Sequence, residues 1–98
     1  MADPAPVVGT LLVRLYLPEA RSLKDKRRVV AGLCERLRSR FGVAVAEVGD
    51  RDAWQTADLA LACVFDTPGS CREVLDKAAR LVESCGSVVV LEMTRDVR

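Results

Sequence analysis

Two segments with the residue spacing of amphipathic helices alternate with four strand-like runs along the chain. Leu and Val side chains recur at helical spacing over residues 23–40, and a second such stripe covers residues 71–85. The strand-like runs lie at residues 7–17, 43–48, 55–65 and 88–94. A chain of 98 residues has room for one compact domain, so all six elements must pack together. This order of elements is the strongest constraint on the fold.

The order strand–helix–strand–strand–helix–strand predicts an α+β sandwich. Right-handed crossovers place both helices on one face of a four-stranded antiparallel sheet, which is the ferredoxin-like βαββαβ arrangement. We expect residues 7–98 to form this single domain and residues 1–6, which include two prolines, to form a flexible N-terminal arm. The second face of the sheet is left without a helix to cover it.

Capping residues predict where the two helices begin and end. Ser22 is the expected N-cap of the first helix, and Gly42 marks its end. For the second helix, Ser70 and Glu73 have the spacing of a capping box, and Gly86 marks the end.

Positive charge is concentrated in the first helical segment. The chain as a whole carries a net charge of only +1, whereas residues 21–40 hold eight basic and two acidic residues, a net charge of +6. We interpret this cluster as a surface that binds nucleic-acid phosphates, with the four cations of residues 24–28 in direct contact and the others extending the positive field. The basic residues are Arg21, Lys24, Lys26, Arg27, Arg28, Arg36, Arg38 and Arg40.

A solvated helix surface is the simpler explanation of such a cluster, and two local features argue against it. Lys24 and Arg28 are like charges at positions i and i+4, which destabilises a helix. Cations in the first turns also lie near the positive end of the helix dipole. A local rule broken without visible compensation indicates a functional reason.

Lys26 and Arg27 occupy positions of the cluster where an apolar, core-facing residue is expected. The apolar stripe that starts at Leu23 should recur before Val30, yet Lys26 and Arg27 occupy those positions. A long cation there extends past the sheet edge, points to a ligand phosphate, or meets a buried carboxylate such as Glu47. The sequence leaves these alternatives open.

The uncovered sheet face is expected to be aliphatic. RNA-recognition motifs stack bases on aromatic side chains of this face, but here Tyr16 is the one plausible ring. A symmetric homodimer that buries the face is the more economical interpretation. The residues assigned to this dimer interface are Val8, Leu12, Tyr16, Val64, Val88 and Val90.

The segment between the two middle strands is rich in turn-forming residues. Asp50 and Asp52 match no complete calcium loop and are expected to be ordinary turn residues. Trp54, the only tryptophan, either caps one end of the core or anchors an interface.

Catalytic and metal-binding constellations are missing from the sequence. There is no histidine, and the four cysteines show no Cys-x-x-Cys spacing, so we expect no metal and no cofactor. Cys71, in the first turn of its helix, is a minor candidate for a nucleophile. No apolar run is long enough to span a bilayer, and the N-terminus has no basic start of a signal peptide. We therefore expect a cytoplasmic protein without a membrane partner.

Residues 22–30, with the sequence SLKDKRRVV, resemble the signature of the YlxP-like family of small bacterial proteins of unknown function. Weaker likenesses lie at residues 45–48 and 52–55, and the similarity runs from about residue 8 to residue 94. The resemblance implies a ferredoxin-like fold and a cytoplasmic location. Members of this family are often encoded beside translation initiation and ribosome-maturation factors, which implies a role near the small ribosomal subunit. The departure within the signature is Asp25, where Glu is common.

Three functional hypotheses follow. We expect a non-enzymatic adaptor that binds ribosomal RNA or a small-subunit assembly particle through its basic first helix. The alternative is a dimeric module that uses the same cations to bind a small anionic metabolite or an acidic protein partner. An enzyme that uses Cys71 or a carboxylate is the third and weakest hypothesis.

Overall fold

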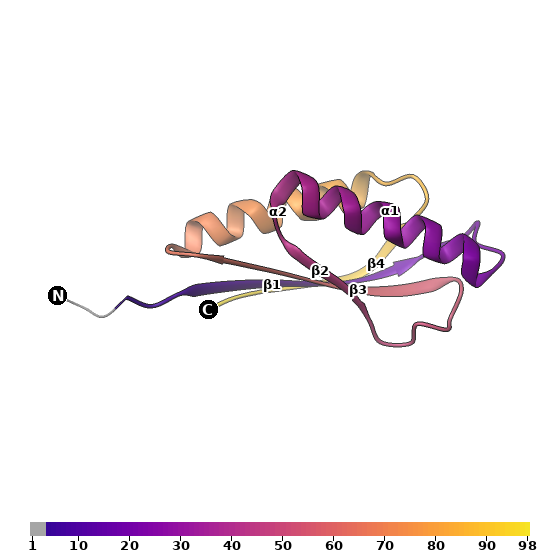
Figure 1. Cartoon of the computed structure of the whole chain (residues 1–98), viewed down its shortest axis with the longest axis horizontal. Coiled ribbons are helices and arrows are strands. Elements are labelled where there is room, and N and C mark those ends of the chain that lie inside the picture. The colour runs from indigo at the N-terminus through magenta and orange to yellow at the C-terminus, as the bar shows by residue number, and fades with distance from the viewer. Residues whose placement is uncertain (1–3) are drawn as a thin grey trace.

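The structure, a computed structural model, describes residues 4–98 and has the predicted ferredoxin-like arrangement. Figure 1 shows both helices on one side of the sheet. Of the expected N-terminal arm, residues 1–3 lie outside the described residues, and residues 4–6 are exposed and form no helix or strand. The elements in chain order are β1 (Val7–Tyr16), α1 (Leu23–Phe41), β2 (Ala44–Val48), β3 (Thr56–Phe65), α2 (Pro68–Ser84) and β4 (Val89–Val97).

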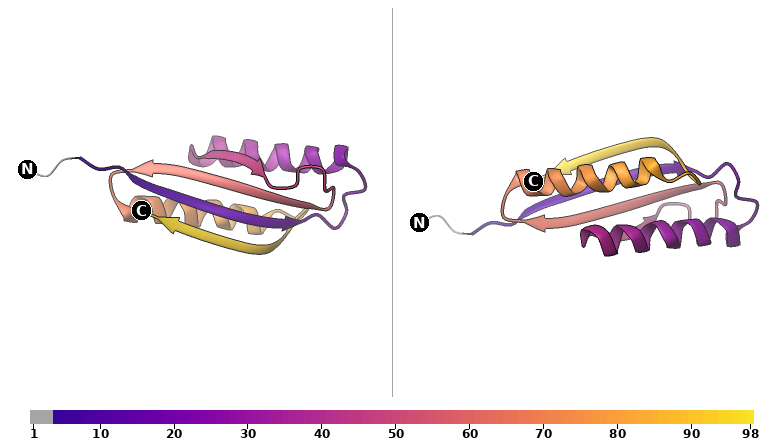
Figure 2. Two further views of the ribbon diagram at one scale, coloured as in Figure 1. Left: turned by 90° about the horizontal axis from the view of Figure 1, so that it is seen from below. Right: turned by 90° about the horizontal axis from the view of Figure 1, so that it is seen from above.

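The sheet is antiparallel throughout, with strand order β2-β3-β1-β4. β1 and β3 are the two central strands and pair along their full lengths, from Val7 opposite Phe65 to Tyr16 opposite Thr56. α1 contacts the edge strand β2, and α2 lies over β1, β3 and β4, as the two views of Figure 2 show. The other side of the sheet is open, as the sequence predicts, and we call it the open face.

The core lies between the helices and the sheet. Alternate residues of β1 point into it, and Leu11, Val13 and Leu15 are at most 2% exposed. The apolar stripes of both helices pack against these residues, and Leu37 of α1 and Leu75 of α2 are completely buried. The strand and helix periodicities therefore predicted these core positions correctly.

The capping residues agree with the prediction for α1. The Ser22 hydroxyl accepts a hydrogen bond from the Asp25 backbone N–H at 3.1 Å. The Asp25 carboxylate in turn accepts the Arg21 backbone N–H at 3.0 Å. Gly42 ends the helix in the left-handed region at φ 64°, which a residue without Cβ adopts easily.

The predicted cap of α2 is wrong. The helix begins earlier, at Pro68, and its N-cap is Thr67, whose hydroxyl accepts the Ser70 backbone N–H at 3.2 Å. Threonine caps helices well and proline suits the first helical position, so these neighbours outcompete a cap at Ser70. Glu73 is consequently inside the helix and pairs with Lys77 one turn further on, at 3.0 Å.

A register shift between Arg14 and Leu15 alters the partner strand β4. Arg14 is opposite Glu92, but the next residue, Leu15, is opposite Val90, so Leu91 is an extra residue in β4. One extra residue in a strand reverses the in-and-out alternation on its far side.

Because of this bulge, two of the residues predicted on the open face lie on the other side of the sheet. Val88 is buried at 8% exposure, and Val90 packs against the core beneath the helices. Val89 and Leu91 are exposed instead, at 48% and 54%. Uninterrupted alternation along β4 would have given the predicted pattern, and a bulge leaves no clear signal in a short aliphatic run.

The close packing of β1 against α2 gives a test of the core. A Cβ on Gly9 would lie 2.9 Å from Leu75 Cδ1 and 3.2 Å from Cys63 Sγ. We expect Gly9→Ala to lower the free energy of unfolding by about 1–3 kcal/mol through overpacking. The matched control is Gly32→Ala on the exposed side of α1, where an added Cβ meets nothing within 4 Å. It should raise the free energy of unfolding by about 0.5–1 kcal/mol. Urea denaturation measures both, and equal effects would contradict the packing described.

Candidate functional site

Lys26 lies at the centre of the candidate site and is completely buried. Among residues 4–98 it is the only buried charged residue. Its Nζ lies 2.9 Å from Glu47 Oε2 on β2, in an ion pair whose carboxylate side chain is 13% exposed. The same ammonium donates to the backbone carbonyl oxygens of Ala53 and of Arg51, the latter at 3.2 Å, and Asp50 O lies at 3.5 Å.

This environment accounts for the hydrogen-bonding capacity of Lys26. An ammonium has three N–H donors, and the three carbonyl oxygens around it can accept them all. Within residues 4–98 no group donates a directed hydrogen bond to Glu47 Oε2, so its contact with Nζ is an electrostatic one. A buried charge is tolerated only when it is paired and solvated by such groups.

The prediction that Lys26 contacts nucleic-acid phosphates is therefore wrong. Its side chain is 0% exposed and its charge is neutralised within the chain. Of the alternatives that the sequence left open, the ion pair with the Glu47 carboxylate is the correct one. The apolar stripe of α1 thus includes a cation because an acidic residue of β2 lies opposite it.

The Lys26 contacts attach the β2–β3 loop (residues 49–55) to α1. The loop is anchored on its other side as well, because the Leu17 backbone N–H donates to Gln55 O at 2.8 Å. The Gln55 side chain lies 3.5 Å from Ala20 O. Within the loop, Asp50 Oδ1 accepts the Asp52 backbone N–H at 3.1 Å, which confirms the turn role predicted for this aspartate.

The other seven cations of the cluster are exposed. Among residues 4–98, no carboxylate lies within 4.0 Å of any of them. Lys24, Arg27 and Arg28 are three and four residues apart, so they share one side of the first turns of α1. We call these three residues the basic face, and Arg21 precedes them just before the N-cap.

The other three predicted cations are separated from the basic face. Arg38 Nη2 donates to Val45 O of β2 at 2.7 Å, which ties its guanidinium to the sheet edge. Arg36 and Arg40 turn toward α2: the Arg36 guanidinium is 3.6 Å from Cys85 Sγ, and Arg40 lines a hollow with Arg80. One sequence cluster is thus divided over three sides of one helix.

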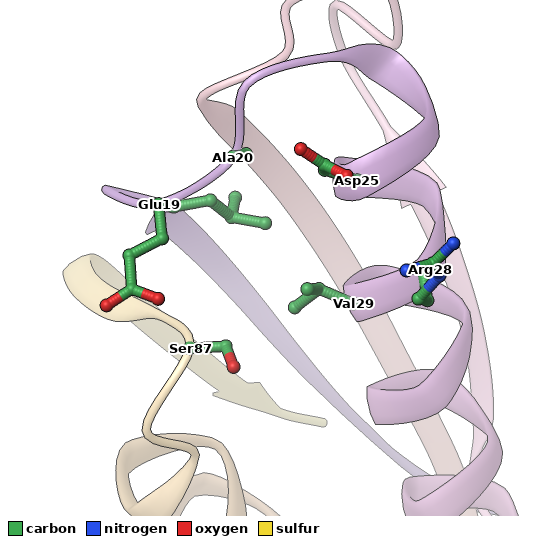
Figure 3. Close-up of a pocket in the computed structure, with 7 residues that line it drawn as sticks. Glu19, Ala20, Asp25, Arg28, Val29 and Ser87 are labelled. Atoms are coloured by element: carbon green, nitrogen blue, oxygen red, sulfur yellow. The ribbon is translucent and has the colours of Figure 1, made fainter.

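A hollow of about 260 Å³ lies between the start of α1 and the two loops beside it. Figure 3 shows its lining, which includes the carboxylates of Glu19 and Asp25 and the guanidinium of Arg28. Two acids beside one cation are a poor match for an anionic ligand. Asp25 is moreover held by the Arg21 backbone N–H as part of the helix cap.

The open face carries the apolar residues predicted on β1 and β3. Val8, Leu12, Tyr16 and Val64 are between 36% and 64% exposed. Arg14 lies among them, and its Nε donates to Asp58 Oδ1 at 3.0 Å. Glu92 Oε2 is 4.0 Å from Arg14 Nη1 on the other side. The charges of this face are therefore paired with one another.

Three of the four cysteines, Cys34, Cys63 and Cys71, are buried. Burial, together with the neighbouring Cys71 thiol, raises the pKa of Cys63 to about 11. Burial also raises the pKa of Cys34. Cys71 is completely buried, and its Sγ lies 3.5 Å from Val7 O. A reactive thiolate needs a lowered pKa and access to its target. The pKa of Cys63 and of Cys34 is raised, and the burial of Cys71 denies its thiol access.

No helix within residues 4–98 is long and apolar enough to cross a membrane. The described residues define a small α+β protein with a ferredoxin-like sandwich and a basic first helix. The chain belongs to the family described as "Protein of unknown function (DUF503)", whose match covers residues 8–95. The uncharacterized protein YlxP of Bacillus subtilis (strain 168) is 29% identical over 78 residues, which are 80% of this chain and 85% of that protein. The resemblance seen in residues 22–30 is thereby confirmed.

Solved structures with the same fold have little sequence similarity to the chain. A putative antibiotic biosynthesis monooxygenase from Chloroflexus aurantiacus J-10-fl has a TM-score of 0.56 at 14% identity, covering 93% of this chain and 92% of that one. The de novo designed protein Foldit4 has a TM-score of 0.52 at 14% identity, covering 96% and 99%. At these identities the likeness establishes the fold alone.

The buried ion pair gives a test of the site. We expect Lys26→Met to lower the free energy of unfolding by about 3–5 kcal/mol, because the buried Oε2 atom of Glu47 is left without its counter-charge. Replacing both partners in Lys26→Met/Glu47→Leu should restore part of this loss. The control Lys24→Met, on the exposed basic face, should change it by less than about 0.5 kcal/mol. Chemical denaturation of the three variants measures these differences, and equal stability of the two single variants would contradict the burial of Lys26.

Proposed function

We infer that the protein is a non-enzymatic, cytoplasmic RNA-binding adaptor whose basic face contacts phosphates. The observation that carries this proposal is that some cations of the cluster are neutralised and others are exposed. Lys26 is neutralised by Glu47, whereas Lys24, Arg27 and Arg28 are exposed without an acidic partner among residues 4–98. Arginine and lysine in this state attract a polyanion through counterion release.

The partner that fits best is structured ribosomal RNA, free or within a small-subunit assembly particle. Phosphate contacts from one helix face give affinity and orientation but little sequence discrimination. Recognition of a folded RNA by shape suits such a face. The genomic context implied by the family resemblance points to the same partner.

A small anionic metabolite is the weaker alternative. The hollow beside Arg28 contains the carboxylates of Glu19 and Asp25, which would repel an anion. An acidic protein partner would use the same basic face as RNA. A pull-down from cell lysate distinguishes the two partners, because a complex that persists after nuclease treatment would indicate a protein.

Salt dependence tests the RNA proposal directly. With about four phosphate contacts, affinity for a ribosomal RNA fragment should fall roughly 10²–10³-fold between about 50 and 300 mM salt. Arg27→Gln/Arg28→Gln should weaken binding at low salt by about tenfold or more. It should also reduce the slope of log K against log salt by roughly 1.4–1.8, since two contacts are lost. Fluorescence anisotropy of labelled RNA measures both quantities.

The matched control removes the same charge from the other helix. Arg72 and Arg80 lie on α2, are exposed and have no acid within 4.0 Å among residues 4–98. Arg72→Gln/Arg80→Gln should leave the affinity and the salt slope close to those of the original chain. Equal losses in the two double variants would mean that net charge alone governs binding, and no binding at low salt would refute the proposal.

We also propose that a second copy of the chain covers the open face. Half-exposed aliphatic residues such as Leu12 and Val64 lie around a group of charges that are already paired. Burying this surface in a symmetric dimer removes apolar area from water without isolating a charge. The interface would comprise Val8, Leu12, Tyr16 and Val64, with Val89 and Leu91 in place of the predicted Val88 and Val90.

Sedimentation equilibrium tests the dimer. The original chain should sediment as a dimer at micromolar concentration, and Leu12→Asp should be a monomer because it places an unpaired carboxylate at the centre of the interface. Ala31→Asp, an exposed position on α1, introduces the same charge on the opposite side and should leave the dimer intact. A monomeric original chain would contradict the proposal.

A further inference from the structure

Trp54 lies in the β2–β3 loop and is 50% exposed. The sequence analysis offered two roles for this ring, a cap on the core or an interface anchor. The first does not hold, since Trp54 is absent both from the core of the described residues and from the partly buried residues that pack against it. A half-exposed indole offers a flat apolar ring to a ligand.

The backbone on both sides of Trp54 is held in place. The carbonyl of the preceding residue, Ala53, accepts a hydrogen bond from the buried Lys26 ammonium. The carbonyl of the following residue, Gln55, accepts the Leu17 backbone N–H at 2.8 Å. These anchors come from α1 and from the end of β1. The ring is thus carried on an ordered segment, which reduces the entropy lost when a ligand binds.

The same anchors place the loop beside exposed cations. Figure 1 shows the β2–β3 connection at the end of the molecule where α1 begins. Arg27 of α1 and Arg51 of the loop line one hollow, together with Glu47 and Asp52. Arg51 precedes Trp54 by three residues, so their Cα atoms are at most about 11 Å apart.

The charge of this hollow favours an anion. Glu47 is already neutralised by Lys26, which leaves the Asp52 carboxylate against two guanidiniums. Lys24 and Arg28 add two more positive charges on the adjacent helix turns. Arginine planes and an indole are the groups that bind nucleotides whose bases are not paired.

We propose that Trp54 stacks on an unpaired nucleobase of the bound RNA while Arg27 and Arg51 contact its phosphates. This inference rests on the proposed RNA-binding function and adds the class of RNA that is recognised. In a continuous duplex the base faces are covered by their neighbours, so a loop, bulge or single strand is needed for stacking. The site therefore prefers RNA with unpaired nucleotides over a regular duplex.

Trp54 is the only tryptophan of the chain, so its fluorescence reports on this position alone. The experiment compares an RNA hairpin with an unpaired loop and a loopless duplex of the same number of phosphates. Anisotropy of labelled RNA gives the affinity, and intrinsic fluorescence gives the environment of Trp54. The hairpin should quench the tryptophan emission and bind more tightly than the duplex.

Substitutions separate stacking from charge. Trp54→Ala should weaken hairpin binding by about tenfold and leave duplex binding and the salt slope unchanged, because base stacking adds roughly 1–3 kcal/mol per base. Trp54→Phe, which retains a flat ring, should keep most of the hairpin affinity. The control Arg72→Ala truncates an exposed side chain of α2, outside the basic face and the proposed dimer interface, and should have no effect on hairpin affinity.

The outcomes distinguish this inference from the proposed function. If both RNAs bind with steep salt dependence, but Trp54 is not quenched and Trp54→Ala binds the hairpin normally, the stacking role is refuted and RNA binding stands. If neither RNA binds at low salt, both proposals fail together. A loss of affinity in Trp54→Ala that extends equally to the duplex would also overturn the inference, because it would indicate a disturbed loop instead of a lost stacking contact.

Discussion

A single buried ammonium organises one end of this protein. The Lys26 side chain extends from α1 into the core and forms an ion pair with Glu47 on β2. Its ammonium also donates hydrogen bonds to three carbonyl oxygens of the β2–β3 loop. A cation in a core is unstable unless such partners are supplied, and here they come from β2 and from the β2–β3 loop that follows it. The position of the loop relative to the helix is therefore determined by the need to satisfy one charge. The residues that we assign to RNA, on the helix and on the loop, are adjacent because of it.

The division of the basic cluster shows how a fold sorts residues that look alike in sequence. Lys26 and Arg27 are neighbours in the chain but lie about 100° apart around the helix axis. One turns into the core and is neutralised, and the other turns outward without an acidic partner among residues 4–98. Arg36, Arg38 and Arg40 are directed to α2 or to the sheet edge. The basic face therefore contains only three of the eight cations. The phosphate-binding proposal based on it is more specific than the one based on the whole sequence cluster.

The open face illustrates the sensitivity of a sheet to a single residue. Alternation along β1 and β3 predicted correctly that Leu12, Tyr16 and Val64 are exposed. On β4 the same rule failed, because Leu91 is an extra residue opposite the step from Arg14 to Leu15. Val88 and Val90 face inward as a result, and neither residue type nor spacing distinguishes them from Val89. The cap of α2 failed for a related reason, since Thr67 and Ser70 are both good caps and only the start of the helix selects between them.

The sequence by itself determined the order of the elements, the core residues of β1, β3 and the two helices apart from Lys26, and the concentration of positive charge. These features follow from periodicity and composition along one segment at a time. Even the pairing of Lys26 with Glu47 was among the alternatives it allowed. The tertiary structure alone decided which alternative holds, which cations stay exposed and which end of the molecule carries Trp54. These outcomes depend on contacts between segments that are more than twenty residues apart, and a local pattern contains no information about which distant carboxylate or carbonyl will lie within reach.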